Sequence, residues 1–165
     1  MIKTSSTRPF TTNTIWLIPL LFFFHNLEEA FQMPQYIANR FSIHFITNKQ
    51  FFIAISILTT FVLLIVILYQ LSIISSIYLI IFIQGCIFFN AVQHIILYFI
   101  YRSYNPGVIS ASIIILFSLF LFSLFLFSSK KLLIPKKKLA STLIFSLISY
   151  PIIIWISLLL ASCFN

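Results

Sequence analysis

Long apolar runs alternate with short polar segments along the whole chain, and this pattern predicts an all-α integral membrane protein. About 20 apolar residues cross the hydrocarbon core of a bilayer as a helix, and unpaired backbone groups cannot be solvated there, so each run must be helical. The runs predict five spans, at about residues 14–31, 51–69, 74–101, 108–127 and 139–163. We therefore expect residues 1–165 to form one domain, a bundle of five transmembrane helices.

The segment between the first two spans, residues 33–50, has a different pattern. Pro34 suits the first turn of a new helix, and Ile37, Phe41 and Phe45 recur at a spacing of four. This spacing predicts a short interfacial helix after the first span. Such a helix would either connect the spans at the membrane surface or cover a site inside the membrane.

Composition agrees with a membrane location. The chain is 61% hydrophobic and 7% charged, whereas a soluble domain is about half apolar and a quarter charged. The net charge of +8 therefore does not indicate a nucleic-acid-binding protein. The expected partners are membrane lipids, and the sequence leaves the oligomeric state open.

The distribution of basic residues predicts the orientation in the cell membrane. With five spans, one side carries Lys3, Arg8, Lys130, Lys131, Lys136, Lys137 and Lys138. The other side carries Arg40, Lys49 and Arg102. Because Lys and Arg collect on the cytoplasmic side, we expect the N-terminus inside, the C-terminus outside, and a basic inner loop at residues 129–138.

Both acidic residues of the chain, Glu28 and Glu29, lie in the sequence HNLEE near the end of the first span. On a helix, Glu29 lies about 40° from His25 and Glu28 about 60° to the other side, so the three side chains share an arc of about 100°. A carboxylate near the bilayer centre costs about 2.5–3.5 kcal/mol, and such residues are usually functional. Alternatively, the pair marks a helix end wetted by headgroup water.

A second polar stripe lies in the third span. Asn90 and His94 are four residues apart, and Tyr98 and Tyr101 continue the same face. At about 1.5 Å per residue, both stripes fall in the outer half of the predicted bundle. The sequence does not establish that they face each other.

The polar segment after the third span reaches the same side of the membrane. Pro106 and Gly107 predict a tight turn into the fourth span, and Tyr104 and Asn105 precede this turn. These two side chains would either hang over the polar cluster or belong to an ordinary outer turn.

Two imidazoles and one or two carboxylates are suitable ligands for zinc or non-haem iron. We therefore expect His25, Glu29 and His94 to bind a metal, and Glu28 to act as general base or as a supporting carboxylate. Asn90, Tyr98 and Tyr104 would orient the substrate or a metal-bound water. The resulting hypothesis is a metal-dependent enzyme acting on a lipid or another apolar substrate. The same groups suit a proton relay in a small transport protein, or a packing clamp in an accessory protein.

The chain resembles the HXXEE family of small bacterial multi-pass membrane proteins over about residues 14–127. The resemblance is carried by His25, Glu28, Glu29, Asn90, His94, Tyr104, Pro106 and Gly107. The resemblance implies a helical membrane protein. It indicates which residues form the site but not which reaction they catalyse. The intramembrane CAAX-protease-like family also pairs adjacent glutamates, but its pattern requires an Arg where this chain has Met33.

Overall fold

The computed structural model describes residues 12–127 and 134–164, and the regular elements in this part of the chain are all α-helices. They are α1 (Thr12–Ala30), α2 (Met33–Phe41), α3 (Asn48–Gln70), α4 (Ile77–Tyr101), α5 (Val108–Phe127) and α6 (Lys136–Ser162). The predicted all-α class is therefore confirmed for the described residues.

Four of these helices, α3, α4, α5 and α6, are long and apolar enough to cross a membrane by length and composition. They correspond to the last four predicted spans. The first predicted span corresponds to α1, which has 19 residues and ends in the polar sequence HNLEEA. Large apolar side chains such as Phe99 and Leu116 are each 70% exposed on the outside of the bundle. Such surfaces are typical of helices surrounded by lipid.

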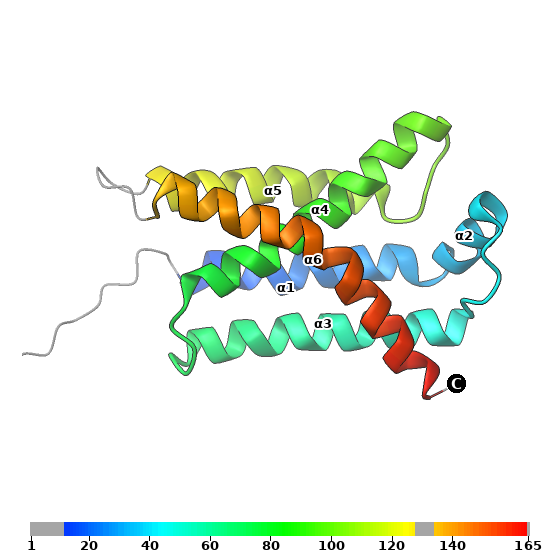
Figure 1. The fold of residues 1–165 in the computed structure, drawn as a ribbon, viewed down its shortest axis with the longest axis horizontal. Coiled ribbons are helices and arrows are strands. Elements are labelled where there is room, and N and C mark those ends of the chain that lie inside the picture. Colours follow the sequence, from blue (N-terminus) through cyan, green and yellow to red (C-terminus); the bar gives the residue numbers. More distant parts are fainter. Residues whose placement is uncertain (1–11, 128–133, 165) are drawn as a thin grey trace, which may run out of the picture.

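The long helices lie roughly along one axis, as Figure 1 shows. Helix α1 packs between α3 and α5, while α4 packs against α5 and α6. Helix α6 crosses obliquely in front of the others and also contacts α3. The short helix α2 lies at the end of the bundle where α1 ends.

The helix ends follow local sequence signals. Thr47 caps α3 by accepting a hydrogen bond from the Gln50 backbone N–H at 3.1 Å, a standard N-cap contact. Helix α6 begins directly after Pro135, because the fixed φ of proline suits a helix start. Lys136, Lys137 and Lys138 therefore belong to the first turn of α6 and not to a loop, and residues 129–133 of the predicted basic loop lie outside the described residues.

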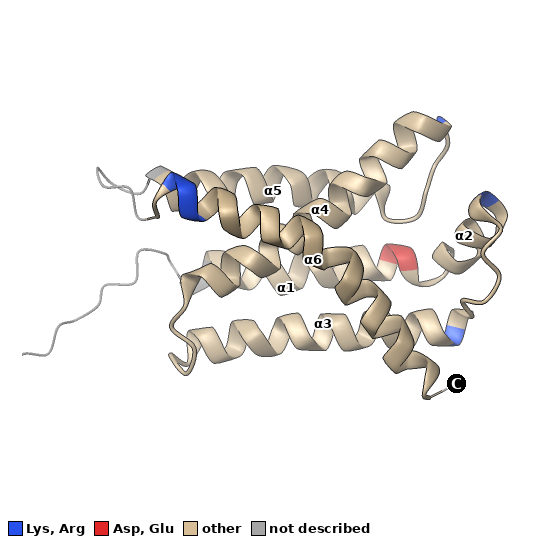
Figure 2. Ribbon diagram, in the orientation of Figure 1, with Lys and Arg blue, Asp and Glu red and all other residues tan. Residues whose placement is uncertain are grey.

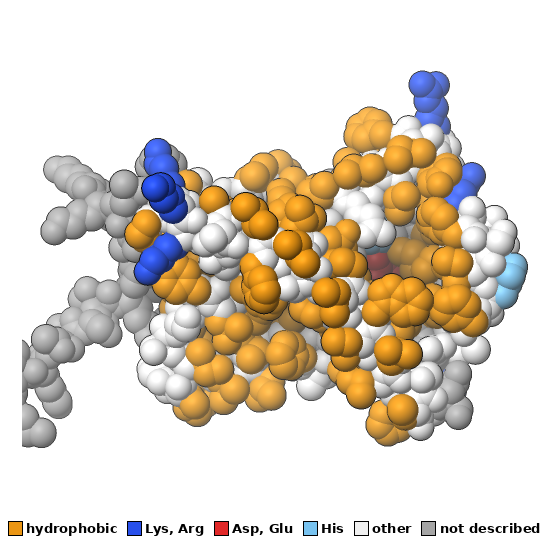
Figure 3. Space-filling view, viewed as in Figure 1, with side chains coloured by type: hydrophobic (Ala, Val, Ile, Leu, Met, Phe, Trp, Pro, Cys, Tyr) orange, Lys and Arg blue, Asp and Glu red, His pale blue; other side chains and the backbone are white. Residues whose placement is uncertain are grey.

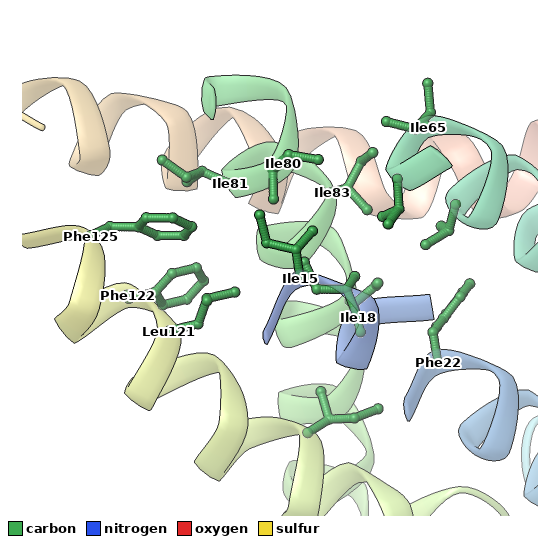
Figure 4. Packing of buried hydrophobic residues seen from close by; sticks show 14 of the residues in the cluster. Ile15, Ile18, Phe22, Ile65, Ile80, Ile81, Ile83, Leu121, Phe122 and Phe125 are labelled. Carbon is green, nitrogen blue, oxygen red and sulfur yellow. The ribbon is translucent and has the colours of Figure 1, made fainter. Parts of the chain in front are cut away.

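The main apolar core lies toward the end of the bundle where α6 begins (Figure 4). Its most deeply buried members include Ile18 of α1, Ile80 and Ile81 of α4, and Leu121 and Phe125 of α5, each at most 1% exposed. A smaller apolar cluster joins α1, α2, α3 and α6 at the other end. These two clusters leave the polar residues of α1 and α4 between the helices, away from lipid.

Helices α4 and α6 approach each other closely at Gly85. A Cβ atom placed on Gly85 would lie 2.5 Å from Ser146 Oγ. Ser146 is fully buried and donates a hydrogen bond to the Phe82 carbonyl of α4 at 3.0 Å. Small residues at such crossings let backbones come together in membrane proteins, and this crossing fixes the position of α4 relative to α6.

Candidate functional site

The polar end of α1 places His25 and Glu29 on one face, as the spacing of four predicts. His25 is fully buried and Glu29 is 6% exposed. Nε2 of His25 lies 3.5 Å from Oε1 of Glu29. In Figure 2 the acidic segment of α1 lies toward α2, far from the lysines that begin α6.

Helix α4 brings the second polar stripe directly against this face. Nε2 of His94 lies 2.7 Å from Oε1 of Glu29, and Asn90 Nδ2 lies 2.9 Å from His25 Nε2. The two imidazole rings are perpendicular, with centroids 4.9 Å apart. The stripes on α1 and α4 therefore form one cluster.

Asn105, in the turn between α4 and α5, determines which nitrogen of His94 carries a proton. Asn105 is fully buried, and its Nδ2 donates to the His94 backbone carbonyl at 3.0 Å. This contact turns Oδ1 toward Nδ1 of the His94 ring, at 2.9 Å. Because an amide oxygen only accepts, Nδ1 must be the donor. Nε2 of a neutral His94 then presents a lone pair to Glu29.

Ser110, in the first turn of α5, does the same for His25. Its hydroxyl donates to Oε2 of Glu28 at 2.5 Å, so its oxygen is left to accept from His25 Nδ1 at 2.8 Å. Nδ1 of His25 therefore carries the proton. Nε2 becomes the acceptor, which agrees with the hydrogen bond that Asn90 donates to it.

The result is a convergence of three acceptor atoms. One ligand atom from each of His25, Glu29 and His94 lies within 4.8 Å of the other two, and all three residues are buried. Lone pairs facing one another in a buried site repel unless a positive charge lies among them. This arrangement therefore requires a metal ion, or a proton held between the Glu29 carboxylate and an imidazole.

Glu28 points to α5 instead of to this cluster. Its carboxylate accepts from the backbone N–H groups of Ile109 at 3.1 Å and of Ser110 at 2.9 Å. These are unpaired N–H groups of the first turn, where a carboxylate is also favoured by the helix dipole. Glu28 thus caps α5 and fixes Ser110 beside His25.

Tyr104 supports the same carboxylate from outside. Its hydroxyl donates to Oε1 of Glu28 at 3.0 Å, and its side chain is 48% exposed. Partial burial and the hydrogen bond to the Glu28 carboxylate raise the pKa of the Tyr104 hydroxyl above its usual value.

Gly107 closes the site on the α5 side. Its φ of +92° is readily available only to glycine. A Cβ atom here would lie 2.9 Å from His25 Cε1, 3.0 Å from His94 Cε1 and 3.1 Å from Glu29 Cγ. The backbone of this turn therefore packs directly on the three converging side chains.

On the opposite side, the cluster borders a cavity of about 210 Å³ between α1, α2, α3, α4 and α6. Asn26, Glu29, Asn90 and His94 supply polar groups, and the wall is otherwise mostly apolar. Figure 3 shows a hollow with an acidic side chain at its base and hydrophobic side chains around it. The polar cluster thus lies at the end of an apolar pocket.

The structure brings together most of the residues expected from the sequence. His25, Glu29, Asn90 and His94 meet in one cluster, and Tyr104 reaches it through Glu28. Tyr98 does not join them, because its ring lies edge-on to Phe99 and its side chain is 43% exposed.

Sequence reasoning missed Ser110, named Gly107 only as a turn residue and left the role of Asn105 undecided. Ser110 and Gly107 contact the cluster, and Asn105 orients His94. All three lie in the sequence NPGVIS, whose polar and turn residues begin a span on the same side as HNLEE. The position of NPGVIS at this end of the span was the sequence feature that could have indicated their role.

Comparison with protein families gives a match between residues 16–122 and a family described as a protein of unknown function with HXXEE motif. The matched range contains the whole cluster and the turn that closes it. No curated protein and no solved structure matches the chain.

Proposed function

The chain belongs to the HXXEE family of proteins of unknown function, and on this premise we propose that it is a membrane-embedded, metal-dependent enzyme acting on a lipid or another apolar substrate. The observation that carries the proposal is the convergence of His25 Nε2, His94 Nε2 and a Glu29 oxygen at the polar end of an apolar cavity. Catalytic metal sites commonly use two histidines and one carboxylate and keep a coordination position open for substrate.

The donor distances are close to those that a metal requires. A tetrahedral ion with ligands at about 2.0–2.1 Å has donor atoms about 3.3 Å apart. The distance from Glu29 Oε1 to His25 Nε2 is 3.5 Å and that to His94 Nε2 is 2.7 Å. The first fits directly, and the second needs to lengthen by about 0.6 Å. The two imidazole nitrogens lie within 4.8 Å of each other. The donor set suits zinc and ferrous iron alike.

The surrounding residues prepare the ligands for this role. Asn105 and Ser110 each hold an imidazole Nδ1–H, so both Nε2 atoms face inward. Such contacts fix the tautomer and raise the basicity of metal ligands. A metal held by His25, Glu29 and His94 would supply Lewis acidity to a substrate oxygen.

Of the two roles expected for Glu28, the contacts favour support. Its oxygens are occupied by Tyr104, Ile109 and Ser110, which leaves them poorly placed to accept a proton from a substrate. Asn90 lines the cavity and donates to His25 Nε2. A cation bound by His25 would replace that hydrogen bond and free the Asn90 amide to orient a substrate.

We also propose that α1 is a fifth span and that the N-terminus is cytoplasmic. Lys136, Lys137 and Lys138 form the first turn of α6, whereas Arg40 lies in the last turn of α2, Lys49 in the first turn of α3 and Arg102 directly after α4. Figure 2 shows basic segments at opposite ends of the bundle. Together with Lys3, Arg8, Lys130 and Lys131, which lie outside the described residues, the first group makes its side the more basic one. The metal site would then lie in the outer half of the membrane.

Metal analysis of detergent-purified protein tests the proposal. Wild type, His25→Ala and His94→Ala are grown with added zinc and iron and analysed beside His44→Ala, which removes an exposed histidine. We expect about one equivalent of metal in wild type and in His44→Ala, and less than a tenth of this in the other two. Wild-type protein that binds neither metal would contradict the proposal.

The short distance between His94 and Glu29 favours one other function, a proton relay. At 2.7 Å these groups can share a proton without any metal. In that case, protein reconstituted in liposomes carries a pH-dependent proton flux that Glu29→Gln abolishes, and the metal content stays below a tenth of an equivalent.

A further inference from the structure

The hydroxyl of Tyr36, on helix α2, is buried and has no hydrogen-bond partner within the described part of the chain. Tyr36 lines the cavity that also borders Glu29 and His94. A buried hydroxyl without a partner loses the hydrogen bonds that water would provide, and native structures seldom leave such groups unpaired. The hydroxyl is covered by neighbouring atoms, and a small shift of the Tyr36 ring would let a ligand in the cavity supply the missing partner.

The shape and lining of the cavity indicate what kind of ligand this is. Its volume of about 210 Å³ exceeds that of the roughly 150 Å³ cavity that holds benzene. It is below the range of about 300–1,000 Å³ typical of sites for drug-sized ligands. Such a volume fits one slender chain and not a two-chain lipid. Phe41 and Phe61 line the cavity and are 40% and 53% exposed, and Figure 3 shows a hollow at the surface, so the cavity is open to the outside of the bundle.

Three polar residues of the cavity belong to the cluster: Glu29 contacts His94 directly and is linked to Asn90 through His25. Other polar side chains of the lining bond elsewhere, Asn26 to Thr59, Tyr150 to Gln93 and Ser157 to the Ile154 carbonyl. Among the described residues, the cavity lining holds the Glu29 carboxylate and no Lys or Arg that could pair with a carboxylate on the ligand. The lining therefore favours a neutral polar group, such as a hydroxyl or an ester, on the ligand.

We propose that the cavity binds a single-chain lipid with a neutral polar group, and that Tyr36 donates a hydrogen bond to this group. The hydrocarbon chain of the lipid lies among apolar side chains of α3, α4 and α6. Its polar group lies between Tyr36 and the Glu29–His94 pair. The proposal depends on the proposed enzyme function only for the idea that this polar group is the one that reacts. Tyr36 is thus a positioning residue for substrate.

Photochemical labelling tests the proposal with a defined probe. Full-length protein in lipid nanodiscs is illuminated with a long-chain fatty alcohol that carries a diazirine, and the adducts are mapped by mass spectrometry. Hexadecanol and hexadecane serve as competitors. We expect adducts on cavity residues such as Ile55 and Ile154, with hexadecanol competing at least tenfold better than hexadecane.

Two variants and one control make the test specific. Ala54→Phe fills the cavity from a position that is 2% exposed and should reduce cavity adducts at least tenfold. Tyr36→Phe should weaken competition by hexadecanol about two- to tenfold, the value of one neutral hydrogen bond. Its thermal midpoint without the probe should not fall, because the lost hydroxyl has no partner. Tyr98→Phe, outside the cavity, should match wild type.

Adducts confined to outward-facing side chains such as Leu116, or equal competition by hexadecane and hexadecanol, would overturn the proposal. A Tyr36→Phe variant that unfolds earlier and competes normally would show that the hydroxyl is structural and would remove its assigned role. Where Ala54→Phe fails to fold, Tyr36→Phe carries the test. Metal content is measured on the same samples. Labelling of cavity residues in protein that contains no metal would contradict the enzyme proposal and still support lipid binding, so the two proposals fail independently.

Discussion

Oε1 of Glu29 lies 2.7 Å from Nε2 of His94, and this contact joins the end of α1 to the middle of α4. The hydrogen bond to Asn105 Oδ1 places the ring proton of His94 on Nδ1. The contact therefore brings two acceptors together unless the carboxylate and the ring share a proton or a metal ion lies between them. Each of the first two predictions below depends on this competition for a positive charge.

Replacing Glu28 and Glu29 one at a time should distinguish the carboxylate that caps α5 from the carboxylate that binds the metal. Glu28→Gln weakens the cap of α5, because an amide has one acceptor oxygen in place of two and no charge. We expect a loss of about 2 kcal/mol in the free energy of unfolding with metal content retained. Glu29→Gln should lose the metal. Thermal unfolding and elemental analysis of both proteins measure this, and equal metal loss in both would contradict it.

Ser110→Ala should weaken metal binding without touching a ligand. The change removes the partner of His25 Nδ1, so the imidazole is free to rotate and to change tautomer. Loss of such a contact typically lowers metal affinity about 10- to 100-fold. Ser112→Ala is the matched control, since Ser112 is exposed on the same helix and, within the described residues, its hydroxyl donates to the Val108 carbonyl of its own helix. Titration against a chelator compares the two, and similar affinities would refute the role of Ser110.

Gly85→Ala should destabilise the bundle and leave the metal centre intact. The new methyl group would lie 2.8 Å from Ser146 Cβ and 2.5 Å from its Oγ. Overpacking of this kind costs about 1–3 kcal/mol. Adding Ser146→Gly should restore at least about 1 kcal/mol through coupling of the two sites. Unfolding midpoints of the single and double variants measure the effect, and strict additivity would show that the two residues do not clash.

Tyr104 should ionise above its usual pKa of about 10. Its hydroxyl donates to Glu28, and the partial burial and this hydrogen bond raise the pKa in the folded protein. A raised pKa contributes stability that is complete below pH 10 and is lost as the pH rises through the folded-state value. The difference in 295 nm absorbance between wild type and Tyr104→Phe reports this titration. In Glu28→Gln the midpoint should move down toward the usual value.

The sequence alone was sufficient to predict the long helices and most residues of the candidate site. Apolar runs of this length can only be helical in a bilayer, so the all-α class did not depend on tertiary detail. The spacing of four put His25 and Glu29 on one face, and likewise Asn90 and His94, because helical geometry is local. The HNLEE sequence was informative because the chain has only two acidic residues.

The boundaries and Tyr98 show where local reasoning ends. The sequence placed Lys136, Lys137 and Lys138 in a loop, but Pro135 starts α6 before them. Tyr98 follows His94 at a spacing of four and yet points to the outside, toward Phe99. The spacing defines a face of one helix only approximately, and the contact made by that face depends on the neighbouring helices.

The sequence by itself determined that the polar groups exist, that they lie on helices, and that each pair shares a face. The tertiary structure decided that α1 and α4 turn these faces toward each other, that Gly107 packs on them, and that Asn105 and Ser110 orient both imidazoles. The reason is physical. Helix formation follows from residues a few positions apart, whereas helix packing in lipid depends on shape and on small residues such as Gly85, distant in the chain from their partners.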